Sequence, residues 1–377
     1  MENKTIPLSS PDITNTEKES VCGVLATSSL ALGPKLNEFE QRFVEYIGVK
    51  YAVAVNSGTS GLHVVIKAFG IGEGDEVITT PFSFVSSANC VLFERAKPVF
   101  VDIDPLTLNI DCGKIEQAIT PRTKAILGVD IFGYPADWKK IQEIAQKHNL
   151  KIIEDSCEAL GAEYDGIKCG NFGQAAVFGF YPNKQLTTGE GGMIVTNDSE
   201  IADICRSMAN QGREAKDGKW LEHVRLGYNY RMSDINAALG VAQLSRIGEI
   251  LGKRNKVAER YNELLKDKPE FSVLYRGSNK DKRSWFVYVV TLSKDYSRQD
   301  RDLIIEKMGQ NGVQCSNYFQ CIHLQPFYKN NYGYKEGSFP IAESISGRTI
   351  ALPFFNNIKE EEMEYIVDTL QNAVKKR

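Results

Sequence analysis

Phe178-Gly-Phe-Tyr-Pro-Asn-Lys-Gln-Leu-Thr-Thr-Gly-Glu-Gly-Gly192 sets one lysine, Lys184, among aromatic, hydroxyl and glycine residues, after the strand-like segment Lys151-Ile-Ile-Glu-Asp155. A lysine that forms a Schiff base must reach its cofactor from a shaped pocket, and a carboxylate at a strand end can keep a pyridine nitrogen protonated. The pair therefore predicts a pyridoxal phosphate site centred on Lys184 and Asp155. The alternative is a solvated loop lysine and a helix-capping aspartate, which either residue alone would favour.

The segments around this stretch predict an α/β fold. Short β-branched runs alternate with helical patterns between residues 51 and 196, as in a sheet built from βαβ connections. The predicted strands are 51–55, 76–79, 98–101, 125–129 and 151–154. Residues 137–148 place Trp138, Ile141 and Ile144 on one face, as expected of a helix that covers a sheet.

The C-terminal part follows a different pattern. A long helical pattern covers residues 235–266, and we predict a domain boundary near Gly248, between a large domain of residues 1–248 and a small domain of residues 249–377. One strong strand at 285–292 precedes helical patterns near 299–310 and 359–374. This arrangement predicts a smaller α+β domain.

The composition limits the classes of partner. The chain has 377 residues, 42% of them hydrophobic and 25% charged, which suits a globular protein of two domains. A formal charge of −3 gives no electrostatic reason to expect nucleic acid or an anionic membrane as partner. The N-terminus lacks the features of a signal peptide, and no stretch approaches the roughly 20 apolar residues of a membrane span. We expect a cytoplasmic protein.

The spacing of cysteines and histidines predicts no metal site. The eight cysteines include no Cys-x-x-Cys pair, and no two of the four histidines stand at i,i+4 spacing. Most of the cysteines are expected to be reduced core residues.

A candidate anion site begins at Asn56-Ser-Gly-Thr-Ser-Gly61, which follows an apolar strand and precedes a helical run. Free backbone N–H groups and nearby hydroxyls at a helix start suit a single phosphate monoester. The glycines do not match the nucleotide P-loop or the dinucleotide fingerprint. The alternative is an ordinary helix cap, although ligands of α/β sheets bind at this kind of position.

Further candidates follow other predicted strands. Thr80-Pro-Phe-Ser-Phe84 brings Phe82 and Phe84 to the sheet edge, where one of them can stack on a flat heterocycle or both can be core aromatics. Acids at 154, 155 and 158 end the strand before Lys184, and buried carboxylates need a donor or a cation. Arg231 suits bidentate binding of a carboxylate, although a surface salt bridge is the ordinary alternative.

Together these segments resemble the DegT/DnrJ/EryC1/StrS family of sugar aminotransferases, a branch of the fold type I pyridoxal phosphate enzymes. The resemblance covers nearly the whole chain, through motifs at 32–34, 56–59, 80–84, 154–159, 181–192, 227–232, 323–326 and 352–353. It implies a large domain with a mixed, mostly parallel sheet flanked by helices, and a smaller α+β C-terminal domain.

The resemblance also implies how the cofactor is held. Lys184 would form the Schiff base, Asp155 would pair with the pyridine nitrogen, and Phe84 would stack on the ring. The cofactor phosphate would be bound by Gly58, Thr59 and Asn183, with Asn229 reaching it from the other subunit of a homodimer. Sites shared in this way require at least a dimer.

The residues implied around the substrate are fewer. Arg231 would take the carboxylate of the amino donor, while Tyr318 and His323 would line the sugar pocket. Glu158 would lie near the cofactor, where several relatives carry glutamine, and its role stays open. Substrate choice is expected to lie in loops 205–226 and 316–339. The candidates there to meet a diphosphate, if they are not simply solvated, are Arg213, Lys216, Lys219 and Arg225.

The implied reaction is a ping-pong transamination. An amino group would pass from an amino acid, expected to be L-glutamate, to C3 or C4 of a nucleotide-linked keto-hexose, for glycan or polysaccharide amino-sugar synthesis. A second hypothesis is a regulatory or sugar-sensing protein that binds pyridoxal phosphate without turnover. The lysine at 184 disfavours the dehydratase relatives that carry histidine there, and the missing nucleotide motifs disfavour an α/β protein without this cofactor.

Overall fold

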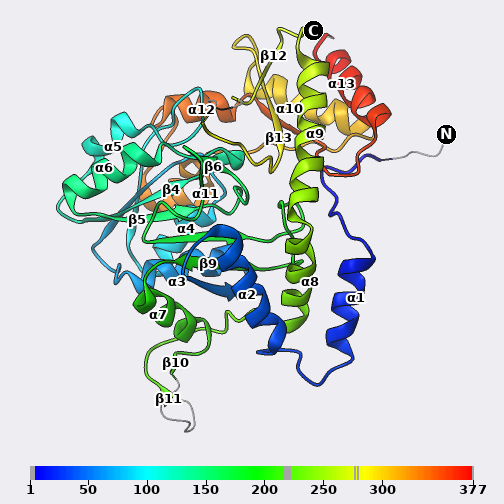
Figure 1. Cartoon of the computed structure of the whole chain (residues 1–377). Coiled ribbons are helices and arrows are strands. Elements are labelled where there is room, and N and C mark those ends of the chain that lie inside the picture. The colour runs from blue at the N-terminus through cyan, green and yellow to red at the C-terminus, as the bar shows by residue number, and fades with distance from the viewer. Residues whose placement is uncertain (1–4, 215–221, 276, 278–279, 376–377) are drawn as a thin grey trace.

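Seven strands form the central sheet of the computed structural model, which describes residues 5–214, 222–275, 277 and 280–375 (Figure 1). Their order along the sheet is β1-β9-β8-β5-β4-β2-β3. Their bounds are β1 (Tyr51–Val55), β2 (Glu76–Thr79), β3 (Lys97–Phe100), β4 (Thr123–Val129), β5 (Lys151–Asp155), β8 (Ala175–Gly179) and β9 (Gly192–Thr196). Only β9 runs antiparallel to its neighbours, β1 and β8. The prediction of a mixed, mostly parallel sheet is confirmed.

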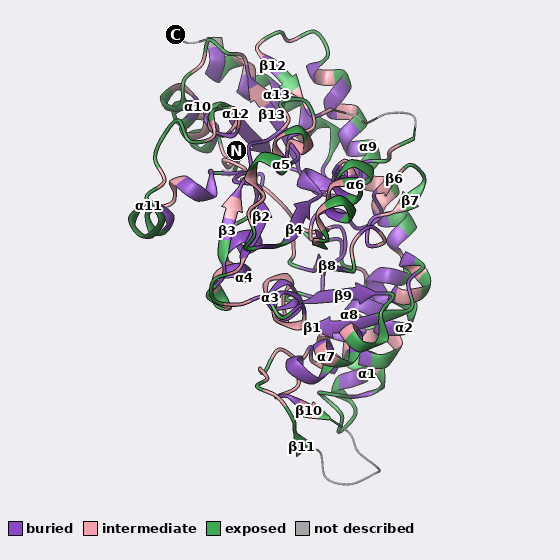
Figure 2. Ribbon diagram, turned by 90° about the vertical axis from the view of Figure 1, so that its left-hand side faces the viewer, coloured by how far each residue is buried: buried purple, intermediate pink, exposed green. Residues whose placement is uncertain are grey.

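The strands of the central sheet are largely buried (Figure 2), and β8 has a core on each of its faces. Val177 packs toward α3 (Gly58–Ala68), where any Cβ at Gly61 would meet its side chain at 2.7 Å. Phe178 points to the opposite face and contacts Phe43 of α2 (Pro34–Ile47), with 5.2 Å between ring centroids. Because neighbouring residues of a strand point to opposite faces, a strand buried on both sides must be apolar throughout.

The other helices of this part pack on the sheet or on one another. They are α1 (Asn15–Leu25), α4 (Ser86–Phe93), α5 (Cys112–Ala118), α6 (Trp138–His148), α7 (Ser199–Ala209) and α8 (Asp234–Ser245). Short elements join them, namely η1 (Ile131–Gly133), β6 (Glu163–Tyr164), β7 (Ile167–Lys168), β10 (Arg213–Glu214) and β11 (Glu222–His223). The described residues contain no helix with the length and apolarity needed to cross a membrane.

The C-terminal part is an α+β unit, as predicted, built on a three-stranded antiparallel sheet (Figure 1). Its strands are β12 (Phe271–Val273), β13 (Tyr288–Leu292) and β14 (Thr349–Leu352). Its helices are α9 (Ile247–Leu265), α10 (Arg298–Gln310), η2 (Ile322–Leu324), α11 (Pro326–Tyr332), α12 (Pro340–Ser346) and α13 (Glu360–Lys375). The predicted helical pattern over 235–266 divides at Arg246 into α8 and α9.

The N-terminal segment lies along this C-terminal part. Ile6 forms a parallel bridge with Val313, and the N–H of Phe354 donates to the carbonyl of Leu8 at 2.9 Å. These contacts join the segment to elements beyond residue 248, although the prediction grouped it with the large domain. The boundary near Gly248 stays a prediction.

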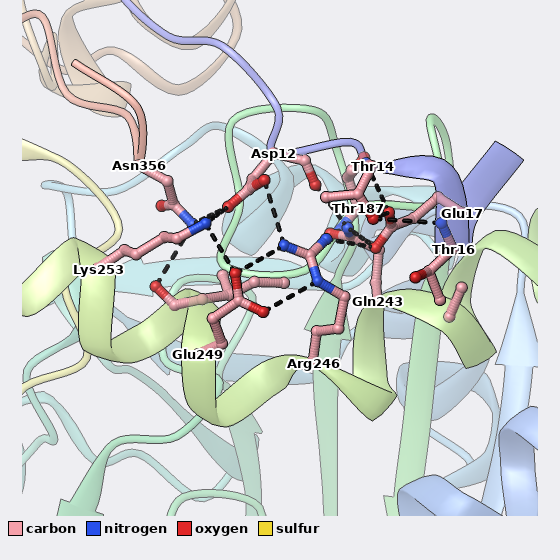
Figure 3. A network of polar contacts seen from close by, with 12 residues as sticks. Asp12, Thr14, Thr16, Glu17, Thr187, Gln243, Arg246, Glu249, Lys253 and Asn356 are labelled. Atoms are coloured by element: carbon pink, nitrogen blue, oxygen red, sulfur yellow. Dashed lines mark hydrogen bonds and ion pairs between the residues drawn. The ribbon is translucent and has the colours of Figure 1, made fainter. Parts of the chain in front are cut away.

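A polar network fastens the same segment to the α8–α9 junction (Figure 3). Arg246 binds Glu17 at 2.7 Å and Asp12 at 3.3 Å, and Lys253 binds Asp12 at 3.0 Å. Burial opposes ionisation of the Glu17 carboxyl, but hydrogen bonds from Thr14 and Arg246 outweigh it and lower its pKa to about 2. The helix break is thus held by charges from residues far away in the sequence.

Candidate active site

A cavity of about 630 Å³ opens at the carboxyl end of the parallel strands. Its wall combines the start of α3, the turn after β2, the end of β5, the loop after β8, and residues 286 and 317–319 of the C-terminal part. Ligands of open α/β sheets bind at this edge because the loops there converge. The structure brings to it Gly58, Thr59, Phe84, Asp155, Glu158, Asn183, Lys184 and Tyr318.

Lys184 projects its amine into this cavity. Its Nζ lies 3.6 Å from Oε1 of Glu158 and 3.8 Å from the centroid of the Phe286 ring, and 14% of its side chain is exposed. The backbone N–H of Lys184 donates to the carbonyl of Tyr181 at 2.9 Å, which shapes the turn that presents the lysine. An amine seated on an aromatic face beside a carboxyl is not a solvated loop lysine.

Asp155 ends β5 and points its carboxylate into the same cavity, with 4% of the residue exposed. The hydroxyl of Ser87 donates to its Oδ2 at 2.7 Å, and the N–H of Cys157 donates to its Oδ1 at 3.3 Å. The hydroxyl of Ser83 lies 2.8 Å from that of Ser87. The carboxylate is therefore oriented from outside, and its cavity side has room for a further cationic partner.

Glu158 is buried beside the lysine amine. The N–H of Phe132 donates to its Oε2 at 2.9 Å, which leaves Oε1 toward Lys184. Burial raises the pKa of the Glu158 carboxyl, and the nearby amine of Lys184 offsets only part of that effect. Glu158 is thus a buried carboxyl, 3.6 Å from the amine, whose burial favours the protonated form.

The start of α3 forms the end wall of the cavity. Ser57 caps the helix by accepting the N–H of Ser60 at 3.0 Å, so the N–H groups of Gly58 and Thr59 have no acceptor within the helix. Gly192 at the start of β9 allows this close approach, because a Cβ there would lie 2.7 Å from the Ser57 carbonyl. Oriented N–H groups at the positive end of a helix suit a phosphate.

The residues that line the cavity fit pyridoxal phosphate. Asn183 belongs to the wall of the cavity, although its Oδ1 is buried without a hydrogen-bond partner among the described residues. Phe84 is 57% exposed, whereas Phe82 is fully buried, so Phe84 is the ring that can cover a flat heterocycle. A phosphate cradle, an aromatic wall, a carboxylate and an amine occur in one cavity.

His323 corrects one prediction. Its side chain is fully buried, its Nε2 lies 3.0 Å from Oε1 of Glu343, and its ring packs on Phe339 with 4.7 Å between centroids. It therefore does not line the cavity of this chain. The family resemblance had placed His323 in the sugar pocket, but an aromatic-rich segment such as 318–339 can cap a pocket or pack in a core, which the sequence pattern does not distinguish.

Asn229 and Arg231 also lie outside the cavity of the same chain. Arg231 donates to Oδ1 of Asn210 at 3.0 Å. Asn229 is exposed between Tyr228 and Tyr230, whose rings stack at 4.9 Å. A contact of Asn229 with a cofactor therefore needs a second subunit.

Four basic loop residues were predicted as candidates to bind a diphosphate. Arg213 and Arg225 do not line the cavity, and Lys216 and Lys219 lie outside the described residues.

Two residues of the site were missed by the sequence reasoning. Ser87 follows the aromatic pair of the loop after β2, and a hydroxyl one turn after Phe84 is the only signal that marks it. Phe286 lies in the predicted strand 285–292, where nothing separates a ring that faces the core from one that faces a cavity. Both depend on contacts between segments that are distant in the sequence.

The mixed sheet, with an aspartate at the end of β5 and a lysine presented from the loop after β8, defines a fold type I pyridoxal phosphate-dependent transferase. Residues 11–371 match the family model of the DegT/DnrJ/EryC1/StrS aminotransferase family. The chain belongs to this family, whose members use pyridoxal phosphate.

Three comparisons illustrate the similarity. A GDP-perosamine synthase of Caulobacter vibrioides is 37% identical, over 98% of this chain and 98% of that protein. The structure of Helicobacter pylori PseC, an aminotransferase involved in the biosynthesis of pseudoaminic acid, has a TM-score of 0.95 and 32% identity, covering 99% of this chain and 100% of that one. The protein Spr1654 of Streptococcus pneumoniae, solved in its PLP form, has a TM-score of 0.94 and 28% identity, with 99% of each chain covered.

Proposed function

We propose that this sugar aminotransferase moves an amino group from L-glutamate to C3 or C4 of a nucleotide-linked keto-hexose, for the synthesis of an amino sugar of a glycan or polysaccharide. The observation that carries the proposal is the amine of Lys184 between Glu158 and the Phe286 ring, in a cavity that Asp155 also lines. The similar GDP-perosamine synthase, whose name is that of a nucleotide-linked amino sugar, supports this substrate class.

Pyridoxal phosphate, when bound, supplies an electron sink that stabilises negative charge at the carbon that gains or loses the amine. Asp155 would hold the protonated pyridine nitrogen, because the carboxylate already has its outer donors from Ser87 and Cys157. The N–H groups of Gly58 and Thr59 would hold the phosphate. Asn183, which lines the same cavity, would add its side-chain amide N–H groups to the phosphate.

Lys184 would carry the proton in each half-reaction. The amine of Lys184, which is only partly exposed to water, would take the proton from the donor Cα and deliver it to the carbon on the other side of the amine nitrogen. Glu158 can exchange a proton with that amine, since burial keeps the pKa of its carboxyl raised. Phe84 would cover one face of the cofactor ring and limit the access of water.

We also propose a homodimer with shared sites. Asn229 is exposed, and its two sequence neighbours are anchored: Tyr228 donates to Glu94 at 3.0 Å, Tyr230 lies 3.2 Å from Nδ1 of His63, and their rings stack on each other. A rigid, exposed amide on one chain can complete the phosphate site of a second chain. Substrate contacts from Tyr318 remain part of the proposal, because its side chain lines the cavity.

The test is the visible absorption spectrum of the protein with pyridoxal phosphate, before and after L-glutamate is added. We expect a visible band that glutamate removes and a nucleotide-linked keto-sugar restores. The K184A variant should bind the cofactor without that band and should not turn over. Full activity of K184A would refute the assignment of Lys184 as the catalytic lysine. A band that no amino donor changes would favour the second hypothesis, a sugar-sensing protein that binds pyridoxal phosphate without turnover.

A further inference from the structure

Arg254 of α9 is a buried cation without an acid beside it. Only 5% of the residue is exposed, and within the described residues it forms no ion pair. Its Nε donates to the carbonyl of Trp285 at 2.7 Å, and its Nη2 donates to the carbonyls of Phe286 at 2.7 Å and Asn183 at 3.1 Å. Burial lowers the pKa of the guanidinium to about 10, so this cation is kept at an electrostatic cost.

The donors of Arg254 tie together two segments that meet at Lys184. The carbonyl of Asn183 belongs to the peptide bond that precedes Lys184, and the N–H of that same peptide donates to Tyr181. Both ends of the peptide are therefore held. The other segment carries Phe286, whose ring lies against the lysine amine at 3.8 Å.

The guanidinium is itself oriented by the N-terminal segment. Its Nη1 donates to Oδ1 of Asn356 at 3.3 Å, and the amide of Asn356 donates to Oδ2 of Asp12 at 3.0 Å. Asp12 belongs to the network around Arg246 and Lys253 (Figure 3). The charge of Arg254 thus meets a carboxylate through one amide, not directly.

A lysine could not replace this arrangement. The planar guanidinium presents five donors in a fixed fork, whereas an ammonium is a point charge on a flexible stem. Three carbonyls and one amide oxygen around a single side chain match the fork. The geometry, not the charge alone, is therefore what the site uses.

We propose that Arg254 is a positioning residue that fixes the amine of Lys184 on the Phe286 ring, and that Asp12 orients Arg254 through Asn356. The inference rests on the proposed function of Lys184. It adds to that function a connection from the N-terminal segment, across α9, to the peptide that carries the lysine.

The experiment compares R254K and R254M with R260M, a matched control on the same helix. Arg260 pairs with Glu263, Glu360 and Glu364 at the surface, so R260M removes an α9 arginine and its ion pairs without touching the cavity. The first readout is the labelling rate of Lys184 by an amine-directed reagent in the cofactor-free protein, measured by peptide mass spectrometry relative to exposed Lys18. The second is the rate at which the visible band forms with pyridoxal phosphate.

We expect both Arg254 variants to label Lys184 several-fold faster and to form the band about tenfold more slowly, because a displaced reacting group loses rate steeply. R260M should match the wild type in both readouts. Wild-type behaviour of R254K would refute the geometric claim, since charge and length would then suffice. Lys184 readouts of R254M equal to those of R260M would show that Arg254 only stabilises the fold.

The milder N356L variant decides the question if the Arg254 variants do not fold. It removes the amide between Arg254 and Asp12, and we expect smaller changes in the same two readouts. No change in either would refute the proposed role of Asp12. A wild type that forms no band would refute the proposed function, while the labelling of Lys184 would still test the positioning.

Discussion

Replacement of Gly192 by alanine tests the packing that forms the phosphate cradle. Gly192 begins β9 opposite Val55 of β1, directly beneath the turn into α3. A Cβ at this position would lie 2.7 Å from the carbonyl of Ser57 and 2.8 Å from the N of Gly58, where ordinary contact begins at 3.4 Å. The turn must therefore move by about 0.7 Å, because neither neighbour is a flexible side chain.

The size of the effect follows from this displacement. Overpacking of this kind costs about 1–3 kcal/mol of the free energy of unfolding. If one charge-assisted hydrogen bond to the phosphate is lost, the cost of about 1.5–3 kcal/mol corresponds to roughly tenfold to hundredfold weaker cofactor binding. We therefore expect G192A to lose both stability and affinity for pyridoxal phosphate.

The assay is urea unfolding of the cofactor-free protein, together with a titration of pyridoxal phosphate followed by absorption. The matched control is G252A in α9, where nothing lies within 4 Å of the added Cβ. That variant should gain about 0.5–1 kcal/mol of stability, because alanine favours the helix, and should bind the cofactor normally. A G192A variant that is destabilised but binds as tightly as the wild type would refute the phosphate site at α3.

Three further variants test the charged groups. D155N should keep cofactor binding but slow the glutamate half-reaction at least about 100-fold in stopped-flow absorption. A neutral amide cannot stabilise the positive charge of the protonated pyridine nitrogen. An unchanged rate would remove Asp155 from the chemistry. Burial raises the pKa of both Asp130 and Glu154, and the single hydroxyl hydrogen of Ser156 cannot satisfy both carboxylates, at 2.7 and 2.9 Å, unless one is protonated. The free energy of unfolding should therefore fall as the pH rises from 4.5, the ordinary pKa of a glutamate, toward about 7, the raised pKa of Glu154. In denaturant titrations at several pH values, D130N should flatten that fall, since its amide can donate to Ser156. The lowered pKa of Glu17 contributes stability that is present above 4.5 and lost as pH falls toward about 2, so E17Q should show a weaker loss over that acid range than the wild type.

Much of the large domain could be predicted because its strands are buried on both faces. The predicted limits of 51–55 and 76–79 agree with β1 and β2, since an apolar run bounded by polar turns marks a buried strand. The strands β8 and β9 were not predicted individually. Their place between β5 and β1 depends on antiparallel pairing across the loop of Lys184, which no local pattern encodes.

The limits of the helices show the same division. The apolar pattern of residues 235–266 continues through Arg246 and gives no sign of the helix break there. The break is held by ion pairs of Arg246 with Asp12 and Glu17 of the N-terminal segment, which a local pattern does not reveal. His323 was assigned to the sugar pocket only by the family resemblance. In the structure His323 lies in the core, where its Nε2 contacts Oε1 of Glu343.

The sequence by itself determined the α/β class, the family resemblance, and the lysine and aspartate of the candidate site, because buried strands and a lysine among glycines and hydroxyls leave local patterns. Only the tertiary structure decided which groups surround them. It brought Ser87 to Asp155, Phe286 and Glu158 to the amine of Lys184, and placed His323 in the core. These contacts join residues from different strands and domains, and their distances depend on packing, which a linear sequence does not contain.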